Sequence, residues 1–311
     1  MSGLNFPKAA SIIEVGPRDG LQNEPQMLPT DQKIQLIERL VAAGAREIEV
    51  TSFTHPRWIP NLADAEDVVR ATAHLDFTSW ALVPNRRGLE RAIAAGTNGV
   101  TLVMSVTDEH NQANLNRPSD ESLSELLNLH AEAIEAGLQV RVSLSVVFGC
   151  PFTGIVAPEK VYRIVDRFAQ AGAKRIGMCD TIGIALPDQV YDLSAALVAR
   201  HPDICFELHL HDTRGMALAN TVAGLQAGIS SFDAAIGGLG GCPYAPGATG
   251  NCASEDLNAL LTGMHIETGI DQAKLMHAAS LLAAWRSSPL ESAAWRVAIA
   301  NETNKNTDKI A

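Results

Sequence analysis

Two histidines separated by one residue are the most informative local feature of the sequence. His209 and His211 lie in the segment Cys205–His211, which has the character of a β-strand. Side chains at positions i and i+2 of a strand project from the same face, so both imidazoles can reach one cation. Asp19, after an earlier strand candidate, could add a carboxylate, and Asn251 could add an amide oxygen. This set suits Mn²⁺, Mg²⁺, Co²⁺ or Zn²⁺, although His-x-His also occurs as ordinary strand structure.

Further charged residues follow strand candidates in the same way. Arg18, beside Asp19, could stabilise an oxyanion, or it could be a surface arginine paired with a neighbouring acid. Glu49 and Asp180 are expected to point toward the same site. Their carboxylates could orient Arg18 or a metal-bound water, or they could be fixed structural anions. Asp212 could support an imidazole or cap the next helix, and capping is the favoured interpretation.

A glycine-rich segment, residues 237–251, surrounds Cys242 with six glycines and two prolines. Such a segment can approach a ligand closely and can act as a lid. Cys242 could transfer a proton or act as a nucleophile, or it could be an inert thiol. The segment is a poor match to a dinucleotide-binding loop, which follows an early strand and opens a helix directly.

A repeated junction organises the elements that must position these side chains. An Ala-rich amphipathic stretch ends in a glycine and a β-rich run follows, as at Gly44 and Gly96. Glycine is expected just past a helix because it adopts the left-handed conformation without steric cost. The strand candidates are 12–15, 47–52, 77–83, 100–106, 140–148, 175–182, 205–211 and 231–237. The helix candidates are 31–43, 63–73, 87–95, 121–136, 158–171, 187–200, 217–227, 255–264 and 272–285.

Eight strands, each followed by a helix, predict an α/β fold in which a parallel sheet closes into a (β/α)8 TIM barrel. An open doubly wound sheet is the alternative. We expect one domain over residues 1–311, with the barrel at about 11–265, extra C-terminal helices at about 270–300 and a disordered tail at 301–311. Active-site groups of a barrel lie at the C-terminal ends of its strands, so the polar residues above should meet at one mouth.

Composition excludes several classes of protein. With 46% hydrophobic residues the chain is not globally disordered, and its net charge of -11 argues against nucleic-acid and anionic-membrane partners. Apolar runs fall short of the roughly 20 residues of a transmembrane helix, and residues 1–10 do not form a secretory signal. Five cysteines, an odd number, favour free thiols and a cytoplasmic location.

Two long motifs resemble signatures of the 3-hydroxy-3-methylglutaryl-CoA lyases. They are EVGPRDGLQNE at 14–24 and GLGGCPYA at 238–245, the latter continued to Asn251. Shorter segments around Glu49, Asp180 and His209 fall in the family's order. The resemblance covers about residues 11–282. It implies a TIM barrel with a divalent cation, Mg²⁺ or Mn²⁺, and an acyl-CoA thioester as substrate. A homo-oligomer, dimer or tetramer, is also expected.

The resemblance also implies roles for individual residues. Arg18 would bind substrate and stabilise an enolate oxygen, and Cys242 would take part in proton transfer. The implied metal ligands are Asp19, His209, His211 and Asn251. The implied acidic positions in or near the site are Glu49, Asp180 and Glu255, the first two being catalytic candidates. The further substrate contacts that we expect are Gln22 and Arg214.

The implied reaction cleaves 3-hydroxy-3-methylglutaryl-CoA into acetyl-CoA and acetoacetate. The hydroxyl proton would leave to Asp19 or to a metal-bound water, the carbon–carbon bond would break, and Cys242 would protonate the enolate. Arg214 replaces a tyrosine common in the family, and segments 104–110 and 145–148 are atypical, so the acyl group stays open. The alternatives are a lyase for another 3-hydroxyacyl-CoA, such as citramalyl-CoA, and a condensing synthase of the isopropylmalate synthase type.

Overall fold

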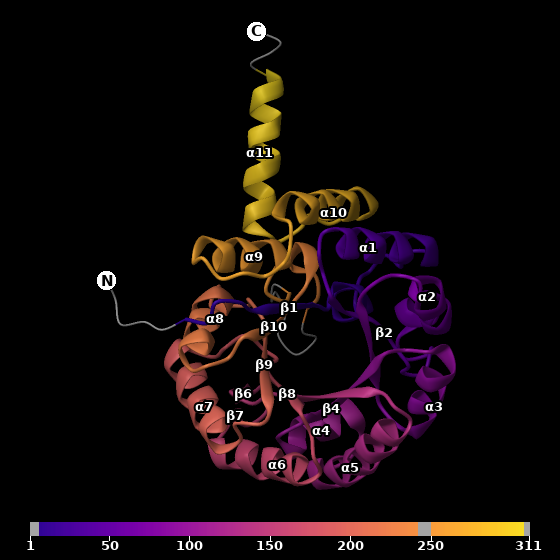
Figure 1. Ribbon diagram of the computed structural model, residues 1–311, viewed down its shortest axis with the longest axis vertical. Coiled ribbons are helices and arrows are strands. Elements are labelled where there is room, and N and C mark those ends of the chain that lie inside the picture. The colour runs from indigo at the N-terminus through magenta and orange to yellow at the C-terminus, as the bar shows by residue number, and fades with distance from the viewer. Residues whose placement is uncertain (1–5, 242–249, 308–311) are drawn as a thin grey trace.

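Eight parallel strands hydrogen bond into a closed barrel that helices surround (Figure 1). The computed structural model describes residues 6–241 and 250–307. The barrel strands are β1 (Ser11–Glu14), β2 (Glu47–Ser52), β3 (Thr78–Val83), β4 (Gly99–Ser105), β5 (Gln139–Ser145), β8 (Arg175–Asp180), β9 (Cys205–Leu210) and β10 (Ser231–Ala234). Around the ring their order is β1-β10-β9-β8-β5-β4-β3-β2. The predicted TIM barrel is therefore confirmed, and the open sheet is wrong.

Helices cover the outside of the barrel and extend beyond it (Figure 1). They are α1 (Thr30–Ala42), α2 (Ala65–Thr72), α3 (Arg86–Ala95), α4 (Asp108–Leu115), α5 (Ser119–Glu135), α6 (Pro158–Gln170), α7 (Pro187–Arg200), α8 (Ala217–Gln226), α9 (Ser254–Gly263), α10 (Gln272–Trp285) and α11 (Ala293–Thr307). Short helical turns are η1 (Gly16–Gly20), η2 (Pro60–Leu62) and η3 (Ile236–Gly238). α6 and α7 begin at prolines, where the missing N–H costs no hydrogen bond. α3 ends at Gly96, whose φ of 85° is left-handed.

Three short elements differ from the sequence-based expectation. Strand β5 ends at Ser145, and the chain then forms an antiparallel hairpin of β6 (Gly149–Cys150) and β7 (Gly154–Ile155). Helix α4 has polar residues all round, so its sequence lacks the apolar spacing that predicts a helix. Contacts with the barrel hold it instead, because Asn111 Oδ1 accepts a hydrogen bond from Ser105 N at 2.9 Å.

The C-terminal helices form a layer on one side of the barrel. Helix α10 packs on α1, and α11 extends outward from the barrel (Figure 1). Helix α11 continues to Thr307, past residue 300 where we expected a tail to begin. Its start is held by Asp256, which accepts hydrogen bonds from Ala293 N and Ala294 N at 2.8 and 2.7 Å. This anchor comes from α9 and is not visible in the local sequence.

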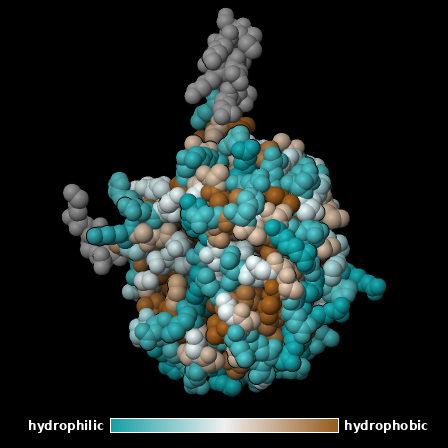
Figure 2. All heavy atoms as spheres, turned by 45° about the vertical axis from the view of Figure 1, so that its right-hand side comes forward, coloured by the Kyte–Doolittle hydropathy of each residue, from teal (hydrophilic) through white to brown (hydrophobic). Residues whose placement is uncertain are grey.

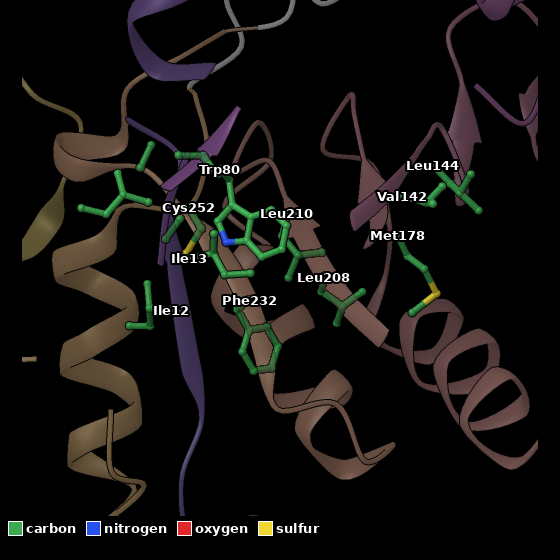
Figure 3. Close-up of a cluster of buried hydrophobic side chains, with 14 of the residues drawn as sticks. Ile12, Ile13, Trp80, Val142, Leu144, Met178, Leu208, Leu210, Phe232 and Cys252 are labelled. Carbon is green, nitrogen blue, oxygen red and sulfur yellow. The ribbon is translucent and has the colours of Figure 1, made fainter. Parts of the chain in front are cut away.

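Alternation along the strands separates an apolar layer from a charged interior. Leu208 of β9 and Phe232 of β10 pack against Gly224 of α8, between barrel and helices. Figure 3 shows both residues among the buried apolar side chains of the strands. The next residue on each strand, His209 and Asp233, projects to the opposite face, inside the barrel. The barrel interior can therefore hold polar groups while the outer layer provides the hydrophobic core.

The face drawn in Figure 2 mixes hydrophilic residues with smaller hydrophobic areas. Within residues 6–241 and 250–307, every helix is too short or too polar to cross a bilayer.

Candidate active site

The three predicted metal ligands meet at the C-terminal mouth of the barrel. Asp19 lies in η1, directly after β1, and His209 lies at the end of β9 with His211 just beyond it. The Nε2 atoms of His209 and His211 are 3.2 Å apart, and His209 Nε2 is 3.9 Å from Asp19 Oδ2. One ligand atom from each residue lies within 4.8 Å of the other two. The structure thus brings together side chains that two distant segments supply.

Asn251 belongs to the same cluster and holds Asp19 in place. Its Nδ2 donates to Asp19 Oδ2 at 2.8 Å and to the Leu239 carbonyl at 3.0 Å. Both amide hydrogens therefore have acceptors, so the amide oxygen is the atom that Asn251 could offer to a cation. An isolated antiparallel β-bridge between His211 and Asn251 fixes Asn251 beside the end of β9.

The donor set fits a divalent cation. The Asp233 carboxylate accepts a hydrogen bond from His209 Nδ1 at 3.0 Å, so His209 Nε2 has a free lone pair. His211 Nδ1 is buried and has no hydrogen-bond partner among the described residues. Two imidazoles and a carboxylate at this spacing match the ligand preference of Mn²⁺, Mg²⁺ or Zn²⁺.

Electrostatics keep Asp19 and His211 in the protonation states that a cation requires. Burial raises the pKa of Asp19, but the charge of Arg18 and the two imidazoles outweigh it, so the pKa lies well below its usual value. Burial and the adjacent His209 lower the pKa of His211 to about 4. Burial lowers the pKa of His209, but its hydrogen bond to Asp233 raises it above the ordinary value. Asp19 is therefore ionised and His211 neutral near pH 7.

Arg18 is fixed at the mouth by two carboxylates. Its Nε donates to Glu49 Oε2, and its Nη1 donates to Asp19 Oδ1 at 2.5 Å. The Arg18 side chain is 11% exposed, so it is not a surface arginine, and the Glu49 side chain is 1% exposed. Glu49 therefore orients Arg18, which is one of the alternatives that the sequence left open. A guanidinium has five N–H groups, so donors remain for a negatively charged oxygen above Asp19.

The other acidic residues bind backbone groups. Asp180 shares its strand face with Met178, and its carboxylate accepts hydrogen bonds from Ile184 N and Ala185 N, both at 3.0 Å. The Asp180 side chain does not point toward the mouth as expected. Of the two alternatives given for this carboxylate, a fixed structural anion is the one that describes it. Asp212 Oδ1 accepts a hydrogen bond from Ala217 N, at the start of α8, at 2.9 Å. This contact agrees with the favoured interpretation, in which Asp212 caps the next helix.

Glu255 and the glycine-rich segment define the edge of the site. Both carboxylate oxygens of Glu255 accept from Gly237 N, at 3.0 and 2.9 Å, so this residue supports η3 and lies behind the mouth. A Cβ at Gly250 would lie 2.4 Å from the Gly238 carbonyl oxygen, so only glycine allows the two ends of the segment to approach this closely. Cys242 lies outside the described residues.

The two expected substrate contacts lie on loops at the C-terminal face. Gln22 follows η1, and its carbonyl oxygen accepts a hydrogen bond from Asn61 Nδ2 at 3.2 Å. Arg214 is exposed on the loop between β9 and α8. Their roles stay predictions.

Two charged residues that support His209 from inside the barrel were missed by sequence reasoning. Asp233 contacts His209, and its other oxygen accepts a hydrogen bond from Arg141 Nη2 at 2.6 Å. The available signal was a charged residue inside an otherwise apolar strand, as in Val140-Arg141-Val142.

Fold and site together define a class: a TIM-barrel protein with a candidate divalent-metal centre beside a buried arginine–carboxylate pair. The chain belongs to the HMGL-like family, whose model matches residues 9–282.

Individual relatives agree with this assignment. The chain is 46% identical to the hydroxymethylglutaryl-CoA lyase YngG of Bacillus subtilis, over 93% of this chain and 97% of the relative. It is 44% identical to the (R)-citramalyl-CoA lyase of Chloroflexus aurantiacus, over 91% of this chain and 93% of that protein. An HMG-CoA lyase from Acinetobacter baumannii, solved with coenzyme A and 3-methylmalate, has a TM-score of 0.87 at 36% identity, covering 94% of this chain and 95% of that one.

Proposed function

We propose that this chain is a divalent-metal-dependent carbon–carbon lyase that cleaves 3-hydroxy-3-methylglutaryl-CoA into acetyl-CoA and acetoacetate. The observation that supports it most is the convergence of Asp19, His209 and His211 beside Arg18 at the barrel mouth. Membership of the HMGL-like family and the B. subtilis relative favour the same substrate.

The ligands that would hold Mg²⁺ or Mn²⁺ are Asp19, His209, His211 and Asn251. When bound, the cation supplies Lewis-acid polarisation of the substrate's oxygen atoms. It also adds positive charge beside Asp19 and Glu49, two carboxylates that share the single guanidinium of Arg18.

The residues of the chain then divide the reaction between them. The substrate's 3-hydroxyl group loses its proton to a base at the mouth, for which Asp19 is the carboxylate candidate. The bond between C2 and C3 breaks, its electron pair passes to the thioester, and a ketone and a thioester enolate form. Arg18 stabilises the enolate oxygen because Glu49 and Asp19 hold its guanidinium in place before the charge develops. Cys242 is the proposed donor of the proton that completes acetyl-CoA.

Citramalyl-CoA is the second candidate substrate. It is supported by the C. aurantiacus relative, whose identity to this chain is only slightly lower. Both thioesters carry a tertiary hydroxyl group and release acetyl-CoA, so the metal centre and Arg18 would serve either one. The discrimination must come from groups that contact the rest of the acyl chain, for which exposed Arg214 is a candidate.

One assay tests the activity and the substrate together. Purified protein with Mn²⁺ is incubated with each of a panel of 3-hydroxyacyl-CoA thioesters, and released acetyl-CoA is measured. We expect turnover of 3-hydroxy-3-methylglutaryl-CoA that a chelator abolishes and that Mn²⁺ restores. His211→Ala should be inactive, whereas His201→Ala, which removes a surface histidine paired with Asp166, should not. Release of acetyl-CoA from citramalyl-CoA alone would select the second candidate, and no release would refute the lyase.

A further inference from the structure

A continuous series of alternating charges occupies the barrel interior below the metal ligands. We call it the interior charge ladder. It consists of Asp233, Arg141, Glu207, Arg175 and Glu47, in that order from the mouth. Asp233 contacts Arg141 at 2.6 Å, Arg141 contacts Glu207 at 2.8 Å, Glu207 contacts Arg175 at 2.6 Å and Arg175 contacts Glu47 at 2.6 Å. Five strands supply these side chains, so the ladder connects the barrel from within.

Stability alone is a poor explanation for charges buried this deeply. The side chains of Arg141, Glu207 and Asp233 are 3%, 1% and 8% exposed. Removing such groups from water costs several kcal/mol per ion, and a well-packed apolar interior is often at least as stable. Buried ion pairs of this kind are instead suited to fixing one geometry. The group whose geometry they can fix lies at the mouth end of the ladder.

That group is His209. Asp233 and His209 are direct neighbours across β10 and β9, so the barrel itself sets their relation. One Asp233 oxygen accepts the hydrogen bond from His209 Nδ1 at 3.0 Å, and the other accepts from Arg141 Nη2. Arg141 thus holds the Asp233 carboxylate in place, and the carboxylate in turn imposes the tautomer of His209 that carries its proton on Nδ1. In that tautomer the unprotonated Nε2 faces Asp19 and His211.

We propose that Asp233 is a positioning residue of the metal centre, which Arg141 holds so that His209 presents the Nε2 lone pair to the cation. This inference rests on the proposed function only in that it assumes a metal at the site. Carboxylate partners of ligating histidines fix ring orientation and tautomer, and their loss typically weakens metal binding by about 10- to 100-fold.

Asp233→Asn is the sharpest test because it keeps the shape of the side chain. Arg141 can only donate, so the amide oxygen is expected to face Arg141 and the NH₂ group to face His209. His209 must then accept at Nδ1 and carry its proton on Nε2, the wrong tautomer for a cation ligand. We expect Mn²⁺ affinity, measured by electron paramagnetic resonance of the free ion, to fall about 10- to 100-fold.

A tautomer measurement separates positioning from general damage to the fold. In metal-free protein with ¹⁵N-labelled histidine, the wild type should show His209 protonated at Nδ1 and Asp233→Asn should show it protonated at Nε2. Asp166→Asn is the matched control, since Asp166 also contacts a histidine and an arginine, His201 and Arg200, but on the outer surface. It should leave both Mn²⁺ affinity and the His209 tautomer unchanged.

Several outcomes would overturn the proposal. They are a wild type that binds no Mn²⁺, an Asp233→Asn variant within twofold of wild-type affinity, and a His209 tautomer that the substitution leaves unchanged. If Asp233→Asn fails to fold, Arg141→Met tests the same step, because an unheld Asp233 should also weaken Mn²⁺ binding. Neither measurement uses a thioester. A protein that binds Mn²⁺ as expected and releases no acetyl-CoA would therefore refute the lyase and leave the role of Asp233 intact.

Discussion

At the scale of single residues, the site depends on charges that are fixed before substrate arrives. Arg18 lies between Glu49 and Asp19, and Asn251 holds Asp19 from the other side. Groups restrained in this way need little reorganisation when negative charge develops, and preorganised donors are worth more in a buried site than in water. We therefore expect Arg18 to act in transition-state stabilisation more than in substrate binding.

Arg18→Gln tests that assignment. We expect kcat to fall about 100- to 1,000-fold while KM changes much less, because the lost interaction forms only with charge that develops during the reaction. Steady-state kinetics with 3-hydroxy-3-methylglutaryl-CoA measures both constants. Arg163→Gln is the control, since it breaks an arginine–carboxylate pair that is exposed on the surface. A variant whose KM rises while kcat stays at the wild-type value would assign Arg18 to binding alone.

The sequence predicted the cluster of candidate ligands but not the residues that orient them. His209 and His211 could be found because strand alternation alone places both imidazoles on one face. Asp233 and Arg141 could not, because their roles depend on which strands are neighbours around the ring. The position of Asp180 was predicted wrongly for another reason, the face of the strand from which its side chain projects. A shift of one residue along a strand exchanges the two faces, so its carboxylate points to a loop and not to the mouth.

At the scale of elements, the turn after β10 rests on two buried carboxyl groups. Glu14 Oε1 accepts hydrogen bonds from Gly16 N at 2.7 Å and Ile236 N at 2.9 Å, and Glu255 binds the N–H of Gly237. Burial raises the pKa of Glu14 to about 7 and that of Glu255 to about 8, despite these hydrogen bonds. The charge of Glu14 also raises the pKa of Glu255. Together they support η3, from which the glycine-rich segment begins.

This arrangement predicts a stability that depends on pH. A carboxyl group whose pKa is raised by folding favours the folded state fully below its unfolded pKa of about 4.5, and the contribution is lost as pH rises through about 7. The contribution of Glu14 to the free energy of unfolding should therefore decrease by about 3 kcal/mol between pH 4.5 and 7. The difference between the wild type and Glu14→Gln isolates this contribution from that of His211, whose lowered pKa acts in the opposite direction. Glu14→Gln should flatten this decrease, because its amide oxygen can still accept from Gly16 and Ile236 and its NH₂ group can donate to Ser254.

Urea unfolding at several pH values measures the effect. The exposed residue Glu90 provides the control, since Glu90→Gln should leave the pH profile of the wild type unchanged. If Glu14→Gln showed the same decrease as the wild type, the raised pKa of Glu14 would not contribute to stability.

Most helices and strands were predictable, and the failures have local causes. The glycine junctions and apolar periodicity located all eight barrel strands, since each unit repeats the same pattern. Helix α4 was not predicted because contacts with the barrel hold it, such as the hydrogen bond from Ser105 N to Asn111. The β6–β7 hairpin was not predicted because each of its strands has only two residues. Helix α11 was not located because the residue that anchors its start, Asp256, lies 38 residues before Ala294 in the chain.

At the scale of the whole molecule, closure of the barrel and assembly of the candidate metal centre are the same event. Asp19 and Asn251 are 232 residues apart in the chain, yet their side chains are hydrogen bonded. β10 lies between β1 and β9 in the ring, so the site spans the seam where the first strand meets the last. The unfolded chain cannot hold these groups together, so a cation that needs all of them binds only the closed barrel.

Metal binding should therefore stabilise the whole fold. For a ligand that binds only the folded state, a concentration of 100 times Kd adds about 2.7 kcal/mol. For a chain of 311 residues this corresponds to a rise in Tm of about 4 °C. Differential scanning calorimetry with increasing Mn²⁺ measures the rise, which a chelator should reverse. In His211→Ala the rise should disappear, while in His201→Ala it should persist because that histidine lies outside the site. A Tm of the wild type that stays constant up to millimolar Mn²⁺ would contradict the coupling between the metal centre and barrel closure.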